Sequence, residues 1–170
     1  HAWYAHLVRE NMKGTKLEGV PVFTKMMASQ VVGNTVEFMD AGFDPFDFAK
    51  WQDVIGFDSG STINGGRIEK LQATDLLTST ADKPLWNSEN HIISDGDENY
   101  TTAHASHVYN DLWQHAIHGL NASTIWVWSR TTNAADAKYG SILNRPDAIV
   151  AAGRATLDLN RNADVVNAFA

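Results

Sequence analysis

Four short apolar runs alternate along the chain with longer segments in which apolar residues recur every three or four positions. The short runs are typical of buried β-strands, and the last is rich in β-branched and aromatic side chains. They cover residues 20–26, 53–58, 84–89 and 123–129. The longer segments predict helices over residues 2–12, 65–79, 101–119 and 148–169, the last with a break near Asn160.

This alternation predicts an α/β fold with a parallel sheet, because parallel strands need a long crossover connection that is usually a helix. The runs are apolar on both faces, as in parallel sheets covered by helices. A doubly wound sheet and part of a (β/α)₈ barrel both fit. The glycine-rich loop of a dinucleotide fold is missing, since Met26, Met27 and Ala28 follow the first run instead. We therefore predict a parallel-stranded, TIM-barrel type of fold, with residues 1–170 forming a single partial barrel domain.

Composition narrows the classes of function. The chain has 170 residues, of which 44% are hydrophobic and 19% charged, so a sizeable core can form. Its net charge of −7, with no basic cluster, argues against nucleic acid or an anionic membrane as a partner. No apolar run approaches the roughly 20 residues of a membrane span. The absence of cysteine excludes disulfides, thiolate nucleophiles and cysteine-bound zinc. We predict no cofactor and no metal.

Polar and aromatic residues gather at the ends of the four runs. In both architectures function lies at the carboxyl ends of the strands. These ends carry Lys25, Asp58, Asn87, Glu89, His91, Trp128 and Arg130. Glu89 is the sharpest candidate, because a carboxylate at the tip of a buried strand is costly to desolvate unless it is used. A structural ion pair with Lys25 or Arg130 explains Glu89 equally well. Trp128 offers a flat platform for a sugar ring, with an ordinary core position as its alternative.

Several segments resemble a known group of enzymes. Residues 84–89 (PLWNSE), the long predicted helix, and residues 119–130, which end in IWVWSR, are similar to strands seven and eight of clan A glycoside hydrolases, above all the family 42 β-galactosidases. Residues 21–25 resemble strand five of these barrels, and residues 46–58 resemble the short helix and strand six. The resemblance spans nearly the whole chain and implies the carboxyl-terminal half, strands five to eight, of a (β/α)₈ barrel.

The resemblance also implies a chemistry. In this clan the carboxylate that ends strand seven is the catalytic nucleophile, which here falls on Glu89. The tryptophan that ends strand eight lines the sugar subsite, which falls on Trp128. We expect double displacement with retention, acting on an oligosaccharide or galactoside. The further substrate-binding residues would be Lys25, Asp58, Asn87, His91 and Arg130. Asp58 stands where a tyrosine that supports the nucleophile is common in the clan.

The resemblance also implies that the acid/base partner of Glu89 is missing from this sequence. The clan supplies it from an Asn-Glu pair at the end of strand four, and no asparagine in the chain is followed by glutamate. The chain opens on His1, inside what resembles the helix after strand four, so we expect it to be a piece of a longer protein. We expect efficient hydrolysis from that parent protein and not from the isolated chain. Open strand edges also predict self-association.

Other functions stay open. His104, His107, Asp111, His115 and His118 are spaced three or four positions apart on a predicted helix, which suits a zinc or iron site. A solvated helix face with ordinary histidines is the simpler interpretation of the same pattern. A non-catalytic carbohydrate-binding fragment would use the same tryptophans, but such modules are mostly β-sandwiches. A purely structural α/β domain would leave the polar strand ends unexplained.

Overall fold

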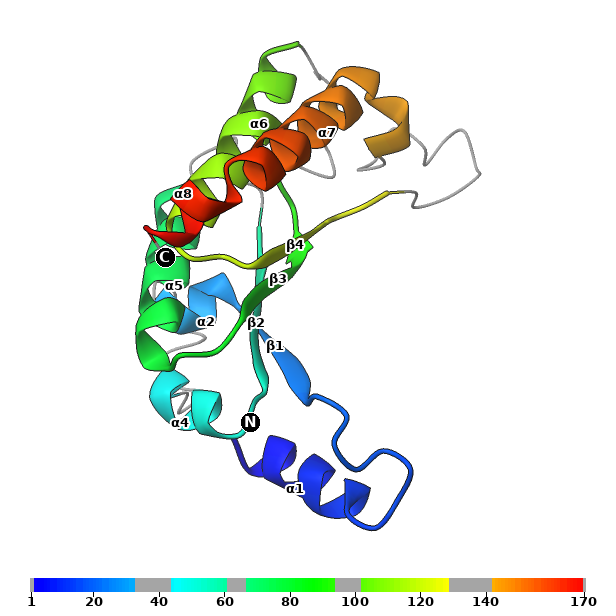
Figure 1. Ribbon diagram of the computed structural model, residues 1–170, viewed down its shortest axis with the longest axis vertical. Helices are drawn as coiled ribbons and strands as arrows, with labels where there is room; N and C mark the ends of the chain where they lie inside the picture. Colours follow the sequence, from blue (N-terminus) through cyan, green and yellow to red (C-terminus); the bar gives the residue numbers. More distant parts are fainter. Residues whose placement is uncertain (1, 33–43, 61–66, 94–101, 129–141, 170) are drawn as a thin grey trace.

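The computed structural model describes residues 2–32, 44–60, 67–93, 102–128 and 142–169. The four strands among these described residues form one parallel sheet, in which neighbours along the chain are neighbours in the sheet (Figure 1). The strands are β1 (Phe23–Met27), β2 (Val54–Ser59), β3 (Leu85–Asn90) and β4 (Ala122–Ile125). The predicted parallel α/β fold is confirmed.

Helices separate the strands. The helix α1 (Ala2–Met12) precedes β1, and α2 (Ala28–Val32) and α4 (Pro45–Lys50) lie between β1 and β2. The two long crossover helices are α5 (Arg67–Thr80), before β3, and α6 (Thr102–Ile117), before β4. After β4 come the short 3₁₀ helix η2 (Ile142–Asn144), α7 (Pro146–Arg161) and α8 (Ala163–Asn167). None of these described helices is both long and apolar enough to cross a membrane.

Local chemistry explains several helix boundaries. The Asp44 side chain accepts hydrogen bonds from the backbone N–H groups of Phe46 (2.8 Å) and Asp47 (3.2 Å), and so caps α4. Pro45 follows at the first helical position, where its missing N–H costs nothing. Gly119, with φ of 91°, adopts the left-handed conformation just after α6, as a glycine C-cap does. Asn162 separates α7 from α8, two residues beyond the predicted break.

The last strand is shorter than its composition predicts. The apolar pattern indicated a strand over residues 123–129, but β4 ends at Ile125. Its register with β3 shifts between Asn87 and Asn90, so the ladder is already irregular before it ends at the pair of Asn90 with Ile125. Trp126 and Trp128 therefore lie beyond the strand.

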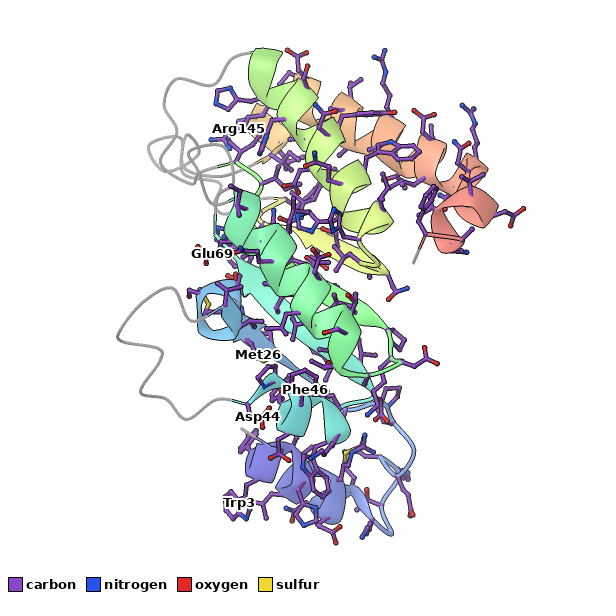
Figure 2. All side chains as sticks on the ribbon, turned by 90° about the vertical axis from the view of Figure 1, so that its left-hand side faces the viewer. Trp3, Met26, Asp44, Phe46, Glu69 and Arg145 are labelled. Atoms are coloured by element: carbon purple, nitrogen blue, oxygen red, sulfur yellow. The ribbon has the colours of Figure 1, made fainter. Side chains whose placement is uncertain are left out.

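The core lies between the sheet and the helices on one side of it. Ile55, Phe57 and Leu85 from the strands pack in one cluster with residues of α2, α4 and α5, which lie along the same side of the strands in Figure 1. Figure 2, viewed from that side, shows α5 in front of the sheet. A second apolar cluster joins α6, η2 and α7 to the segment after β3. These layers hold the strand ends in a fixed arrangement.

Candidate active site

The carboxyl ends of β1, β2 and β3 bring four predicted site residues together. Parallel pairing places Asp58 opposite Glu89, so the last residues of neighbouring strands share one edge of the sheet. Lys25 reaches this edge from β1, and His91 follows directly after β3. One carboxylate oxygen of Asp58, one of Glu89 and one ring nitrogen of His91 all lie within 4.8 Å of one another. We call these four residues, Lys25, Asp58, Glu89 and His91, the charged edge.

Lys25 contacts both carboxylates of the charged edge. Its Nζ lies 3.2 Å from Asp58 Oδ2 and forms an ion pair with Glu89 Oε2. Asp58 is the most buried of the three side chains, at 9% exposure, against 20% for Glu89 and 42% for Lys25. The ion pair with Lys25, one of the two explanations that the sequence left open, is therefore present, and Glu89 stays partly accessible.

His91 faces the other oxygen of Glu89. Its Nε2 lies 3.3 Å from Glu89 Oε1 and 4.0 Å from Asp58 Oδ1. The imidazole ring stacks on Trp126, with 5.5 Å between the ring centroids. The two oxygens of Glu89 thus meet two different nitrogen-bearing side chains, which orients the carboxylate plane.

A metal ion would compete with Lys25 at this edge. Two carboxylates and an imidazole are ligands that divalent metals use. The ammonium group of Lys25 already supplies the positive charge that these ligand atoms attract, and it sits between the two carboxylates. The arrangement is that of a carboxylate pair bridged by a side-chain cation.

The remaining predicted site residues have different surroundings. Asn87 is fully buried: its Nδ2 donates to Ser59 Oγ (2.8 Å) and its Oδ1 accepts from the Glu89 backbone N–H (3.3 Å). These bonds make Asn87 a support for the strand that carries Glu89, and they argue against a direct contact with substrate. Trp128 is 59% exposed beyond β4. Arg130 lies outside the described residues.

An aromatic layer lies next to the charged edge on the same face of the sheet. Phe23 is two residues before Lys25 in β1, so both side chains point to one face. The Phe23 and Trp86 rings have centroids 4.6 Å apart, and Trp86 Nε1 donates to Thr124 Oγ1 (3.0 Å). Gly56 makes room for this layer, because a Cβ atom there would overlap the Phe23 ring.

A buried ionic network behind β3 was not predicted. Lys70 on α5 donates to both carboxylate oxygens of Asp111 on α6, each at 3.1 Å, and all these groups are 1% exposed. Thr74 Oγ1 and His115 Nδ1 lie 3.0 Å apart one turn further along the same two helices. Asn90 Nδ2 connects the network to the strand tip, at 3.4 Å from Asp111 Oδ2. The sequence held one signal of this network. Lys70 and Thr74 are four residues apart on one helix, and their partners Asp111 and His115 are four apart on the next.

This network bears on both interpretations of the histidine-rich helix. Asp111 and His115 are buried, so the helix face that carries them is not solvated. The carboxylate that a metal site would need is already bound by Lys70. His118 lies on another side and contacts Asp75 Oδ1 through Nδ1 at 2.5 Å. A helix-borne metal centre therefore has no support among the described residues.

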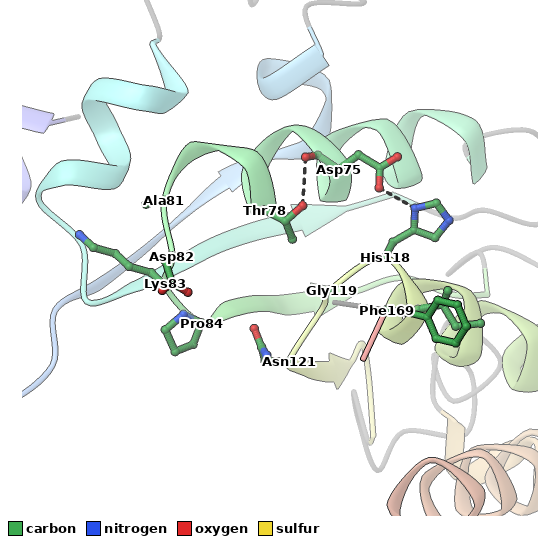
Figure 3. Close-up of a pocket in the computed structure, with 11 residues that line it drawn as sticks. Asp75, Thr78, Ala81, Asp82, Lys83, Pro84, His118, Gly119, Asn121 and Phe169 are labelled. Carbon is green, nitrogen blue, oxygen red and sulfur yellow. Dashed lines mark hydrogen bonds and ion pairs between the residues drawn. The ribbon is translucent and has the colours of Figure 1, made fainter. Parts of the chain in front are cut away.

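A pocket at the opposite end of the strands is separate from the charged edge. It has a volume of about 600 Å³ and lies where the chain enters β3 and β4, between α5 and the end of α6 (Figure 3). The His118–Asp75 contact lies on its wall, and Phe169 also lines it, on the same side of Figure 3 as His118. Because Glu89 is at the carboxyl end of β3, this pocket does not belong to the candidate active site.

Comparison with solved structures identifies the fold. The chain is similar to an apo GH42 exo-carrageenase from Bacteroides ovatus, with a TM-score of 0.77 and 24% sequence identity over 98% of this chain. The chain has the fold of part of a TIM barrel. It spans about a quarter of the length of that exo-carrageenase, since the match covers 25% of that chain. No family model matches the sequence, and no curated protein matches it. The resemblance inferred from the sequence is thus confirmed for the fold.

Proposed function

We propose that this chain carries the nucleophile of a retaining glycoside hydrolase, and that the nucleophile is Glu89. The observation that carries the proposal is the position of Glu89: a partly exposed carboxylate at the carboxyl end of a strand in part of a TIM barrel. Active sites of TIM-barrel enzymes lie at that end of the strands. The likeness to a solved GH42 exo-carrageenase supports glycosidase chemistry for the site.

In the proposed reaction, Glu89 attacks the anomeric carbon of the sugar. A bond forms between the carboxylate oxygen and that carbon while the bond to the leaving oxygen breaks, and a general acid protonates the leaving group. Water then attacks the glycosyl-enzyme, loses a proton to the same residue acting as base, and releases the sugar with retained configuration. The ion pair with Lys25 and the contact with His91 favour the ionised, oriented form of Glu89 that this attack requires.

The second carboxyl group is the part of the mechanism that the described residues do not supply well. Retaining enzymes place it about 5–5.5 Å from the nucleophile. Asp58 is close to Glu89 but is buried and bound to Lys25, so it is poorly placed to protonate a leaving group. We therefore propose that none of the described residues supplies the acid/base, which agrees with the absence of an Asn-Glu pair from the sequence.

Galactosides are the proposed substrates, with Trp128 as the platform for the sugar ring. Trp128 is exposed just beyond β4, and an exposed tryptophan suits stacking against the apolar face of a pyranose. The β-galactosidase resemblance favours simple galactosides. The structural likeness to an exo-carrageenase adds carrageenan oligosaccharides to the substrates that should be tried.

The test uses a substrate whose departure needs no general acid. A dinitrophenyl 2-deoxy-2-fluoro-β-galactoside has a leaving group that departs unprotonated, so labelling depends on the nucleophile alone. We expect the purified chain to gain the mass of one fluorogalactosyl group, located on Glu89 by peptide mapping. Glu89→Gln should abolish labelling, whereas the matched change Glu10→Gln, on α1, should leave it unchanged. Absence of label, or label on another residue, would contradict the proposal.

A further inference from the structure

We propose that Lys25 is a positioning residue for Glu89: anchored by Asp58, it keeps the Glu89 carboxylate ionised and oriented. This inference rests on the proposed function for its catalytic meaning, because it concerns the group that we assign as nucleophile. It differs from the expectation drawn from the sequence, in which Lys25 and Asp58 were both substrate-binding residues.

The first support is the path of the Lys25 side chain. In the sheet register Lys25 stands opposite Gly56 on β2, which has no side chain to meet it. Its ammonium group lies further along, against Asp58 on β2 and Glu89 on β3. A side chain from β1 therefore crosses β2 to reach β3, and both of its contacts at the end of that path are carboxylates.

The second support is the charge balance of the edge. A carboxylate oxygen of Asp58 lies within 4.8 Å of one of Glu89. Two carboxylates this close disfavour each other's ionised form. Lys25 Nζ sits against both, which offsets the repulsion. Among the described residues, the titratable groups facing Glu89 are Lys25 from β1, Asp58 from β2 and His91 from the segment after β3.

The third support is the division of exposure between the two carboxylates. Asp58 is nearly buried, whereas Glu89 is about twice as exposed. The more buried group has the greater need of a fixed counter-charge, so Asp58 is suited to anchoring Lys25. The more exposed group remains open to an incoming sugar. One lysine thus serves two carboxylates with different tasks.

The first arm of the test measures the ionisation of Glu89 directly and needs no enzymatic activity. The chain contains six glutamates, so carbon-13 NMR of a chain labelled at the glutamate carboxyl carbons gives few signals, and Glu89→Gln identifies the one from Glu89. In Lys25→Met we expect the midpoint of the Glu89 titration to rise by about one pH unit or more. Lys25→Arg should restore it, and adding Asp58→Asn to Lys25→Met should lower it again. Lys50→Met, which removes an exposed surface lysine, is the matched control.

The second arm reads reactivity. The rate of labelling by the fluorogalactoside should fall at low pH, and in Lys25→Met this acidic limb should move to higher pH by the same amount as the NMR midpoint. At higher pH, where Glu89 is ionised in both proteins, the rate in Lys25→Met should stay below that of the wild type, because the carboxylate has lost an orienting contact. Lys25→Gln provides a polar neutral replacement, should the methionine variant fail to fold. Repeating the measurement with His91→Gln separates the contribution of the histidine.

The two arms distinguish the two hypotheses. If the wild-type chain is labelled at Glu89 but neither the midpoint nor the acidic limb moves in Lys25→Met and Lys25→Gln, the inference about Lys25 is wrong and the proposed function survives. If Glu89 is never labelled, the proposed function fails, and the NMR midpoint still decides whether Lys25 controls the ionisation of Glu89. A parallel shift of midpoint and limb, restored by arginine, supports both.

Discussion

Gly56 is where the aromatic layer and the sheet meet most closely. It lies in the middle of β2 and is buried, and the Phe23 ring occupies the space in which a side chain would stand. The Phe23 ring in turn packs against Trp86 and cannot move away without disturbing that contact. The requirement for glycine here is steric, because it comes from a neighbouring ring.

We expect Gly56→Ala to destabilise the protein by about 1–3 kcal/mol, the usual cost of overpacking a well-packed site. Gly153 provides the matched control. It lies exposed within α7 with nothing near the position of its Cβ, so Gly153→Ala should stabilise the protein by about 0.5–1 kcal/mol. Urea unfolding followed by circular dichroism measures both changes. Equal effects of the two substitutions would show that the Phe23 ring does not restrict position 56.

At the scale of single residues, the sequence predicted the charged edge but not its internal contacts. Glu89, Asp58, Lys25 and His91 could be found because each follows or ends an apolar run, and parallel strands end at a common edge. The path of Lys25 across β2 to Glu89 could not be predicted from the sequence, because it depends on how the side chain passes over Gly56. The burial of Asn87 could not be predicted for a similar reason: its position near the end of the strand was clear from the sequence, but not that its side chain points into the buried layer.

At the scale of secondary structure elements, α5 and α6 are joined by ionic groups rather than by apolar contacts alone. Burial lowers the pKa of Lys70, and Asp111 opposes that change. Burial raises the pKa of Asp111, but Lys70 and His115 lower it by more. The pKa of this carboxyl group therefore lies below its usual range. Each charge is thus tolerated in the interior only because the other is present.

We expect Lys70→Met to destabilise the protein by about 3–5 kcal/mol, because it leaves the Asp111 carboxylate buried without its cation. The double change Lys70→Met with Asp111→Leu should recover most of that loss, since it removes both charges. Lys50→Met, at an exposed pair with Asp47, should cost no more than about 1 kcal/mol. Urea denaturation of the three variants at neutral pH provides the comparison. A double variant no more stable than Lys70→Met would exclude an ionic origin.

Element boundaries were predictable where a local signal marks them. The bounds of α1 match the apolar pattern, and Gly119 marks the end of α6. The strand β4 was predicted too long because β-branched and aromatic residues continue past Ile125, whereas pairing with β3 does not. Propensity describes which residues suit a strand, but the neighbouring strand decides how many of them pair. The short helices α2, α4 and α8 carry too few residues for a periodic pattern.

At the scale of the whole molecule, the sheet has two outer edges. The strand order leaves β1 on one edge and β4 on the other, with no described strand paired beyond either. The two edge strands, β1 and β4, run in the same direction. The helices α2, α4 and α5 cover only one side of the sheet in Figure 1. Open edges of this kind pair readily with other chains.

We therefore predict that the purified chain self-associates through these edges. Its net charge of −7 opposes association, so added salt should strengthen it by screening the repulsion. Met27 is an exposed residue at the end of the edge strand β1. If this edge mediates association, Met27→Lys should weaken it about tenfold, a change of about 1.4 kcal/mol. Ile68→Lys changes an exposed apolar residue on α5, away from the edges, and should have little effect. Sedimentation velocity across a range of concentrations measures each constant. A monomer at every concentration and salt level, or equal weakening by both lysines, would show that the edges do not mediate association.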